Sequence, residues 1–160
     1  MALTAAETGL VVFATLHTNS AAKAIDRIID AFPAAEQEQI RIVLAENLRA
    51  VVAQQLLRRK GGGRIPAFEI LLGSSALSNA IREGKTSLIN NQIQTGRARG
   101  MVSMDYSLSE LLRADIVEPD EALDRASDRD AIRNLTASLA EARSAPGAAH
   151  ARSPRPTTAR

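Results

Sequence analysis

The stretch that most limits the fold is residues 10–16, which read Leu-Val-Val-Phe-Ala-Thr-Leu and are apolar at almost every position. A half-exposed strand would alternate apolar and polar residues, so this stretch predicts a strand buried on both faces inside a parallel sheet. Parallel sheets carry helices on both faces. The sequence therefore predicts an α/β fold.

A helix is expected directly after this strand. Asn19 or Ser20 can cap its first turn, and apolar residues recur at helical spacing from Ile25 to Phe32. Pro33 closes the element because proline cannot continue a helix. Together these segments form a strand, a turn and a helix.

The middle of the chain predicts a long amphipathic helix over residues 34–59, because apolar residues recur there at steps of three and four. The glycines at 61–63 then predict a turn, and residues 65–72 predict a second strand. Turns led by glycine or an acid separate the short helices expected at residues 75–83, 86–95, 105–114, 119–126 and 129–143.

These elements suggest three parts. Residues 1–73 would form the α/β part and residues 74–143 a helical region. From 144 to 160 the chain is rich in Ala, Pro, Arg, Ser and Thr without apolar periodicity, so we expect this tail to be disordered.

Composition excludes several classes of protein. With no cysteine, the chain has neither disulfides nor thiolate metal sites, and no cluster of histidine and carboxylates has metal spacing, so no metal site is expected. The pI near 9.5 comes with a formal charge of only +2, which becomes −1 without Arg152, Arg155 and Arg160 of the tail. We therefore expect no nucleic-acid binding, and no apolar run reaches the ~20 residues of a membrane span.

Polar side chains gather where the predicted strand ends. Thr15, His17, Thr18 and Asn19 occupy this position, and ligands of open α/β sheets bind outside the carboxyl ends of the strands. His17 could donate a hydrogen bond to the terminal phosphate of a nucleotide. The alternative is that it only caps the following helix.

Two glycine-containing stretches resemble phosphate-binding loops without meeting the requirements. Residues 79–86 come within one residue of the pattern Gly-x-x-x-x-Gly-Lys-Thr, but Asn79 replaces the first glycine and residues 75–83 predict a helix. Residues 61–63 are flanked by cations, yet three glycines between elements are more typical of a turn. We interpret neither stretch as a phosphate site.

The chain resembles the PilT-type secretion ATPases over about residues 2–126. The similarity is densest over some thirty residues, and shorter matches follow. The matching segments are Ala-Ala-Glu-Thr-Gly at 5–9, Leu-Val-Val-Phe-Ala-Thr-Leu-His-Thr at 10–18, Ser-Ala-Ala-Lys-Ala-Ile-Asp-Arg-Ile-Ile-Asp-Ala-Phe-Pro at 20–33, Gln-Gln-Leu-Leu at 54–57, Gly-Gly-Gly-Arg at 61–64, Glu-Ile at 69–70, Gln-Thr-Gly at 94–96, Gly-Met at 100–101 and Asp105.

The resemblance implies the C-terminal part of a RecA-like P-loop ATPase core, followed by a helical region. It assigns His17 a catalytic role near the γ-phosphate of ATP, and it places Thr15, His17 and Thr18 in the nucleotide site. The longer protein would use ATP with Mg²⁺. The phosphate-binding loop and catalytic glutamate of the family precede the segment at 5–9 and are absent from this sequence, so we expect neither hydrolysis nor tight nucleotide binding by these 160 residues alone.

The family's retraction members also carry a helix reading Ala-Ile-Arg-Asn-Leu-Ile-Arg-Glu. This chain reads Ala-Leu-Ser-Asn-Ala-Ile-Arg-Glu at 76–83, so Ser78 stands where the first arginine would be. Leu10 is a second departure, since relatives usually have histidine there. The residues that match the retraction motif are Ala76, Asn79, Ile81, Arg82 and Glu83.

The family implies a homo-hexameric ring in the cytoplasm. It would contact a pilus platform protein of the inner membrane and drive pilus retraction and twitching motility. Two alternatives remain open: a non-catalytic helical interaction module, or part of a related type II secretion or pilus-assembly ATPase. The imperfect motif at 76–83 keeps the related ATPase open, although the stretch at 20–33 favours the retraction type.

Overall fold

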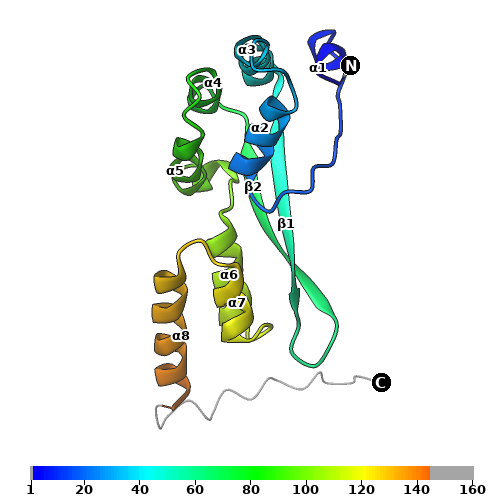
Figure 1. Cartoon of the computed structure of the whole chain (residues 1–160). Helices are drawn as coiled ribbons and strands as arrows, with labels where there is room; N and C mark the ends of the chain where they lie inside the picture. Colours follow the sequence, from blue (N-terminus) through cyan, green and yellow to red (C-terminus); the bar gives the residue numbers. More distant parts are fainter. Residues whose placement is uncertain (1, 145–160) are drawn as a thin grey trace, which may run out of the picture.

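The computed structural model describes residues 2–144, and Figure 1 shows their arrangement. Most of the expected helices are confirmed within a residue or two. The predicted disordered tail lies outside the described residues, apart from Ser144. The helices, 3₁₀ turns and strands are α1 (Ala2–Glu7), α2 (Ala21–Asp30), α3 (Gln37–Asn47), β1 (Ala50–Arg58), β2 (Arg64–Leu72), α4 (Ser75–Arg82), η1 (Thr86–Leu88), α5 (Ile89–Thr95), η2 (Arg97–Arg99), α6 (Met104–Arg113), α7 (Pro119–Arg125) and α8 (Arg129–Ser144).

The long helix expected over residues 34–59 is wrong. Only α3 is helical, and the chain then forms β1, which pairs antiparallel with β2 from Ala50 opposite Leu72 to Arg58 opposite Arg64. Apolar residues spaced three and four apart also occur in a strand whose side chains alternate between two faces. In β1, Ala53 and Leu57 face the core, whereas Val52 is 60% exposed on the opposite face. Pairing with β2 makes these residues a strand rather than a helix.

The tip of this hairpin explains why the two strands can pair. Gly61, Gly62 and Gly63 all have positive φ, at 80, 109 and 77°, a region that residues with a Cβ rarely adopt. The amide of Arg59 donates to the carbonyl of Gly63 at 3.1 Å and closes the loop. The turn predicted from the three glycines is therefore confirmed, but it joins two strands rather than following a helix.

Residues 10–16 are not a buried strand in this structure, so that prediction is wrong. The segment is extended without a neighbouring strand, and within residues 2–144 the backbones of 11–15 make no hydrogen bond to other backbone groups. Phe13 is 94% exposed and Val11 is 81% exposed. A strand requires a hydrogen-bonded neighbour, and no described segment occupies that place.

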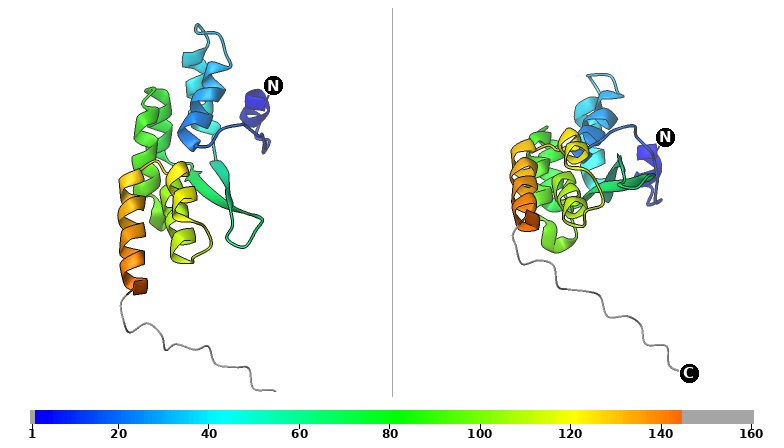
Figure 2. Two further views of the ribbon diagram at one scale, coloured as in Figure 1. Left: turned by 60° about the horizontal axis from the view of Figure 1, so that its bottom comes forward. Right: turned by 90° about the horizontal axis from the view of Figure 1, so that it is seen from below.

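The hairpin joins two hydrophobic clusters. The first cluster combines α2 to α5 with Leu71 of β2, and the second combines α6 to α8 with Leu57 of β1 and Ala67 of β2. Figure 2 shows α4 to α8 on one side of the hairpin. Leu71 packs with Leu77 and Ile81, so the first cluster contains residues from both sides of the domain boundary predicted between residues 73 and 74. That boundary stays a prediction.

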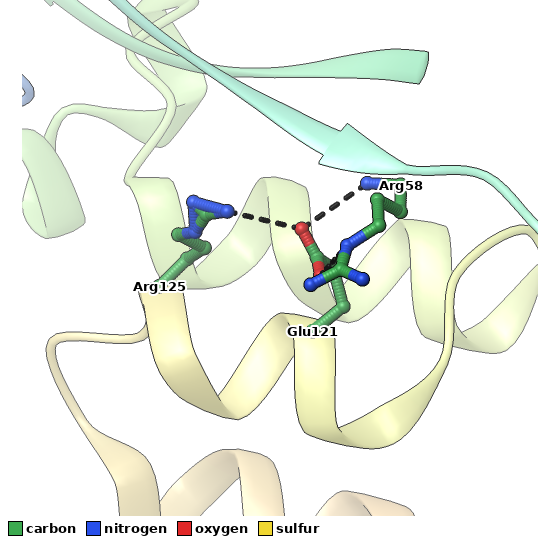
Figure 3. A network of polar contacts seen from close by, with 3 residues as sticks. All are labelled: Arg58, Glu121 and Arg125. Carbon is green, nitrogen blue, oxygen red and sulfur yellow. Dashed lines mark hydrogen bonds and ion pairs between the residues drawn. The ribbon is translucent and has the colours of Figure 1, made fainter. Parts of the chain in front are cut away.

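Charged groups fasten the end of the hairpin to the helical region. Glu121 of α7 is nearly buried, and its carboxylate accepts from the Arg58 amide at 3.1 Å and pairs with Arg58 Nε at 3.3 Å and Arg125 Nη2 at 3.1 Å (Figure 3). The Arg58 side chain is 83% exposed, so its ion pair with Glu121 is screened by water and contributes little to stability. Through these contacts Glu121 ties the end of β1 to α7.

A second ion-pair group lies beside the first. Asp115, in the turn between α6 and α7, pairs with Lys60 of the hairpin tip at 2.7 Å and with Arg143 near the end of α8 at 2.8 Å. The hydrogen bonds from Lys60 and Arg143 lower the pKa of Asp115 below its ordinary value. The group is exposed, so its contribution to stability is small.

Candidate functional site

The residues from Leu16 to Asn19 form one rim of an open groove of about 840 Å³, and α2 forms the other rim. A bond from the Thr18 amide to the Leu16 carbonyl at 2.9 Å turns the chain at this point. Ser20 then caps α2 by accepting from the Lys23 amide at 3.4 Å. The groove is lined by Leu16, His17, Thr18, Asn19, Lys23, Asp26, Arg27, Asp30 and Gln54.

Two of the three residues predicted for the nucleotide site line this groove. His17 is exposed and Thr18 half-buried, and both face the charged side of α2. Thr15 instead lines a neighbouring cavity of about 620 Å³ beside α1, α3 and the start of β1, where Thr18 is also present. The structure therefore places His17 and Thr18 at one groove and Thr15 at the adjoining cavity, which shares Leu16, Thr18 and Arg27 with the groove.

A phosphate group in this groove would contact side chains rather than a ring of backbone N–H groups. The amide of Ala21, first in α2, donates to Glu69 Oε1 at 2.7 Å, and the amide of Lys23 is occupied by Ser20. Nucleotide triphosphates are usually held by several free amides of a glycine-rich loop. Two amides at the start of α2 are therefore already paired, and the groove is not built from a glycine-rich loop.

The near-match to a phosphate loop at residues 79–86 is not a loop in the structure. Its first part is α4, and the Gly84 and Lys85 amides donate to the carbonyls of Ile81 and Ala80 at 3.1 and 2.8 Å. Lys85 Nζ pairs with Glu83 at 2.8 Å. Because both amides are used by the helix end, this segment has none to wrap a phosphate.

The five residues of the retraction motif have two different environments. Ala76, Asn79, Arg82 and Glu83 are exposed on or just after α4, whereas Ile81 is fully buried in the first cluster. None of the five lines the groove that holds His17. The buried Ile81 side chain therefore holds α4 against the first cluster, and the other four residues are exposed to solvent.

Ser78 replaces the motif's first arginine and has a contact of its own. Its hydroxyl donates to the Ala45 carbonyl of α3 at 2.6 Å. A short side chain thus fastens α4 to α3 at this position.

Sequence reasoning missed Glu69. It is the only buried polar or charged residue among residues 2–144, at 6% exposure, and its two carboxylate oxygens accept from the amides of Ala21 and Met104 at 2.7 and 3.4 Å. A signal was present, because Glu69 lies between Ala67 and Leu71 in the inward-facing register of β2. An acid at such a position predicts a buried carboxylate with specific donors.

Two negative findings complete the description. Nowhere in residues 2–144 do three histidine, aspartate or glutamate side chains come together as metal ligands could. Over the same range, no helix has the length and apolar character needed to cross a membrane.

Comparisons with known proteins place the chain. Residues 1–141 match the family described as "Type II/IV secretion system protein". The "Twitching motility protein" of Neisseria gonorrhoeae is 49% identical over 133 residues, 82% of this chain and 36% of that protein. The "Type IV pilus retractation ATPase PilT" of Pseudomonas aeruginosa is 46% identical over 126 residues, 79% of this chain and 37% of that protein.

Solved structures agree with this placement. The crystal structure titled "Pilus Retraction Motor PilT and Bound ADP" superposes with a TM-score of 0.73 at 38% identity, covering 83% of this chain and 37% of that one. The Legionella pneumophila ATPase DotB shares the fold, with a TM-score of 0.63 at 22% identity. The chain thus spans between 36 and 37% of the length of the two pilus proteins it matches.

Proposed function

The chain belongs to the type II/IV secretion system protein family, and from this premise we propose that it acts as the C-terminal part of an ATP-driven motor that retracts type IV pili. The observation that carries the proposal is the joint similarity of sequence and fold to PilT over more than three quarters of the chain. The family match over residues 1–141 spans both the groove and helices α4 to α7. A general helical module would not need the segment at 10–18.

His17 is the residue on which we base the chemistry. It is exposed at the rim of the groove beside Thr18, so its imidazole can donate to a phosphate oxygen presented from outside this chain. Among the described residues, the groove contains no glycine-rich loop, so the phosphate-binding loop and any Mg²⁺ would be supplied by another part of the longer protein. Thr15 and Thr18 would support the same site from the adjoining segment.

The exposed segment at 10–16 supports the same proposal. Leu10, Val11 and Phe13 are 64, 81 and 94% exposed, whereas Val12 and Leu16 are partly covered. Exposed apolar patches of this kind mark an interface. We infer that the remainder of the longer protein covers this segment and adds strands beside it.

The proposed assembly follows from the family rather than from contacts seen here. The motor would be a homo-hexamer in the cytoplasm, next to the inner membrane through a pilus platform protein. The exposed face of α4, with Asn79, Arg82 and Glu83, would transmit motion to that machinery.

The proposal can be tested by joining these 160 residues to the part of P. aeruginosa PilT that they do not cover. In that protein, His17→Ala should lower the kcat for ATP by about 10²-fold, because one donor to a charged transition state is lost. The nucleotide Kd should change by no more than about threefold. The readouts are steady-state turnover and titration with a fluorescent nucleotide.

A matched control separates chemistry from folding. Glu110→Ala, an exposed change on α6, should leave turnover and assembly unchanged. If His17→Ala turned over ATP at the parental rate in an assembled ring, His17 would have no part in the mechanism.

A further inference from the structure

Glu69 occupies the junction of the two hydrophobic clusters. On the inward face of β2, its neighbour Ala67 belongs to the second cluster and Leu71 to the first. At 6% exposure its carboxylate is shielded from water. A charge in such a place must be satisfied by specific donors.

The two donors come from the first turns of two different helices. Ala21 is the first residue of α2 and Met104 the first residue of α6, and each sends its backbone N–H to a different oxygen of Glu69, at 2.7 and 3.4 Å. These amides have no partner within their own helices. The positive ends of both helix dipoles therefore face one carboxylate.

Among the described residues, no other carboxylate accepts a hydrogen bond from the first amide of either helix. The first turn of α2 contains no acidic residue. The first turn of α6 contains Asp105, but its oxygens accept from the amides of Ser127 and Asp128 at 2.8 and 3.0 Å. Glu69 is thus the one described carboxylate that both helix starts share.

The segment leading into α6 is also held against β2. The amide of Ile70 donates to the carbonyl of Val102 at 2.7 Å, and the return bond measures 3.0 Å. This pair fixes the backbone two residues before Met104. A shift of α6 along β2 would therefore move the Met104 amide relative to Glu69.

We propose that Glu69 is a positioning residue that couples α2, one rim of the groove holding His17, to α6 and the second cluster that α6 joins. Each oxygen serves one helix, so displacing either helix changes the carboxylate's fit to the other. The groove's relevance rests on the proposed function, but the coupling is testable in this chain without any nucleotide.

Replacing Glu69 with glutamine is expected to break one of these two hydrogen bonds. Glu69→Gln keeps the size and shape of the side chain but replaces one acceptor oxygen with an NH₂ group, which cannot accept a hydrogen bond. The variant can serve only one of the two helices. A side chain that merely fills space would tolerate the change.

The test is residue-resolved amide hydrogen exchange in the full 160-residue chain. Ser20→Ala removes the cap of α2, and we expect it to speed exchange of the Met104 amide about threefold or more by way of Glu69. The matched control is Ser74→Ala, which removes the cap of α4, where the Ser74 hydroxyl accepts from the Leu77 amide at 3.1 Å. It should leave the Met104 amide unchanged.

In the Glu69→Gln background, Ser20→Ala should no longer change the exchange rate of the Met104 amide. The proposal is overturned if Ser20→Ala leaves Met104 exchange unchanged while Glu69 is present, or if the effect persists equally with glutamine. Should Glu69→Gln fail to fold, the comparison of Ser20→Ala with Ser74→Ala decides alone. His17→Ala turnover tests the proposed function separately, so either idea can fail without the other.

Discussion

Leu71→Ala is expected to lower the free energy of unfolding by about 2–5 kcal/mol, the usual loss for truncating a fully buried leucine. Leu71 has no exposed surface and packs in the first cluster with Leu77 and Ile81. A domain of this size is stable by only about 5–15 kcal/mol. The substitution should therefore remove a large fraction of the total stability.

The same substitution tests whether the hairpin makes the two clusters one cooperative unit. Tyr106 is the single tyrosine and lies in α6, with the guanidinium of Arg97 in η2 3.9 Å from its ring centre. Its fluorescence therefore reports on the contact between α6 and η2, while circular dichroism reports on the whole chain. Because β1 and β2 contribute to both clusters, the two probes should shift to the same lower urea midpoint. Separate midpoints would show that the clusters unfold independently.

Val52→Ala is the matched control for Leu71→Ala. Val52 lies on the same hairpin but is 60% exposed on its outer face. Its truncation should cost no more than about 1 kcal/mol, in line with the range of strand preferences. A loss as large as that of Leu71→Ala would contradict the assignment of the two faces.

The second large effect concerns residues 10–16. In the 160-residue chain the amides of residues 11–15 should exchange with solvent almost freely, because they make no backbone hydrogen bonds within the described residues. Joined to the uncovered part of P. aeruginosa PilT, the same amides should exchange at least about 10³-fold more slowly, as expected for a strand whose local opening costs about 4 kcal/mol.

Amides of α5 provide the internal control, because Ile89 and Ile93 are already buried in the first cluster. Their exchange should change far less on joining the two parts. Rapid exchange of 10–16 in a well-folded joined protein would mean that the segment is not a sheet strand.

The sequence predicted the helices well because their start and stop signals are local. Ser20, Ser74 and Ser103 each cap a helix through a side-chain oxygen, and Pro119 begins α7. These signals depend on residues within one turn. No distant contact is needed to read them.

The failures arose where distant contacts decide. Residues 48–58 have apolar spacing compatible with a helix, but pairing with β2 made them a strand. Residues 10–16 have the composition of a buried strand, but no described segment lies beside them. Strand formation depends on a partner that composition cannot supply.

The candidate site was predictable only in part. The resemblance identified His17 and Thr18, and the structure places both at one groove. It gave no reason to separate Thr15 from that groove, nor to single out Glu69. The donors of Glu69 lie 48 and 35 residues away along the chain, so only the folded chain shows them.

The most direct test of the proposed motor function is ATP turnover by the joined protein, with the 160-residue chain alone as its control. We expect magnesium-dependent turnover by the joined protein and neither turnover nor tight nucleotide binding by the chain alone. Turnover by the chain alone, or a correctly assembled joined ring without turnover, would contradict the assignment of this chain to the C-terminal part of a retraction motor.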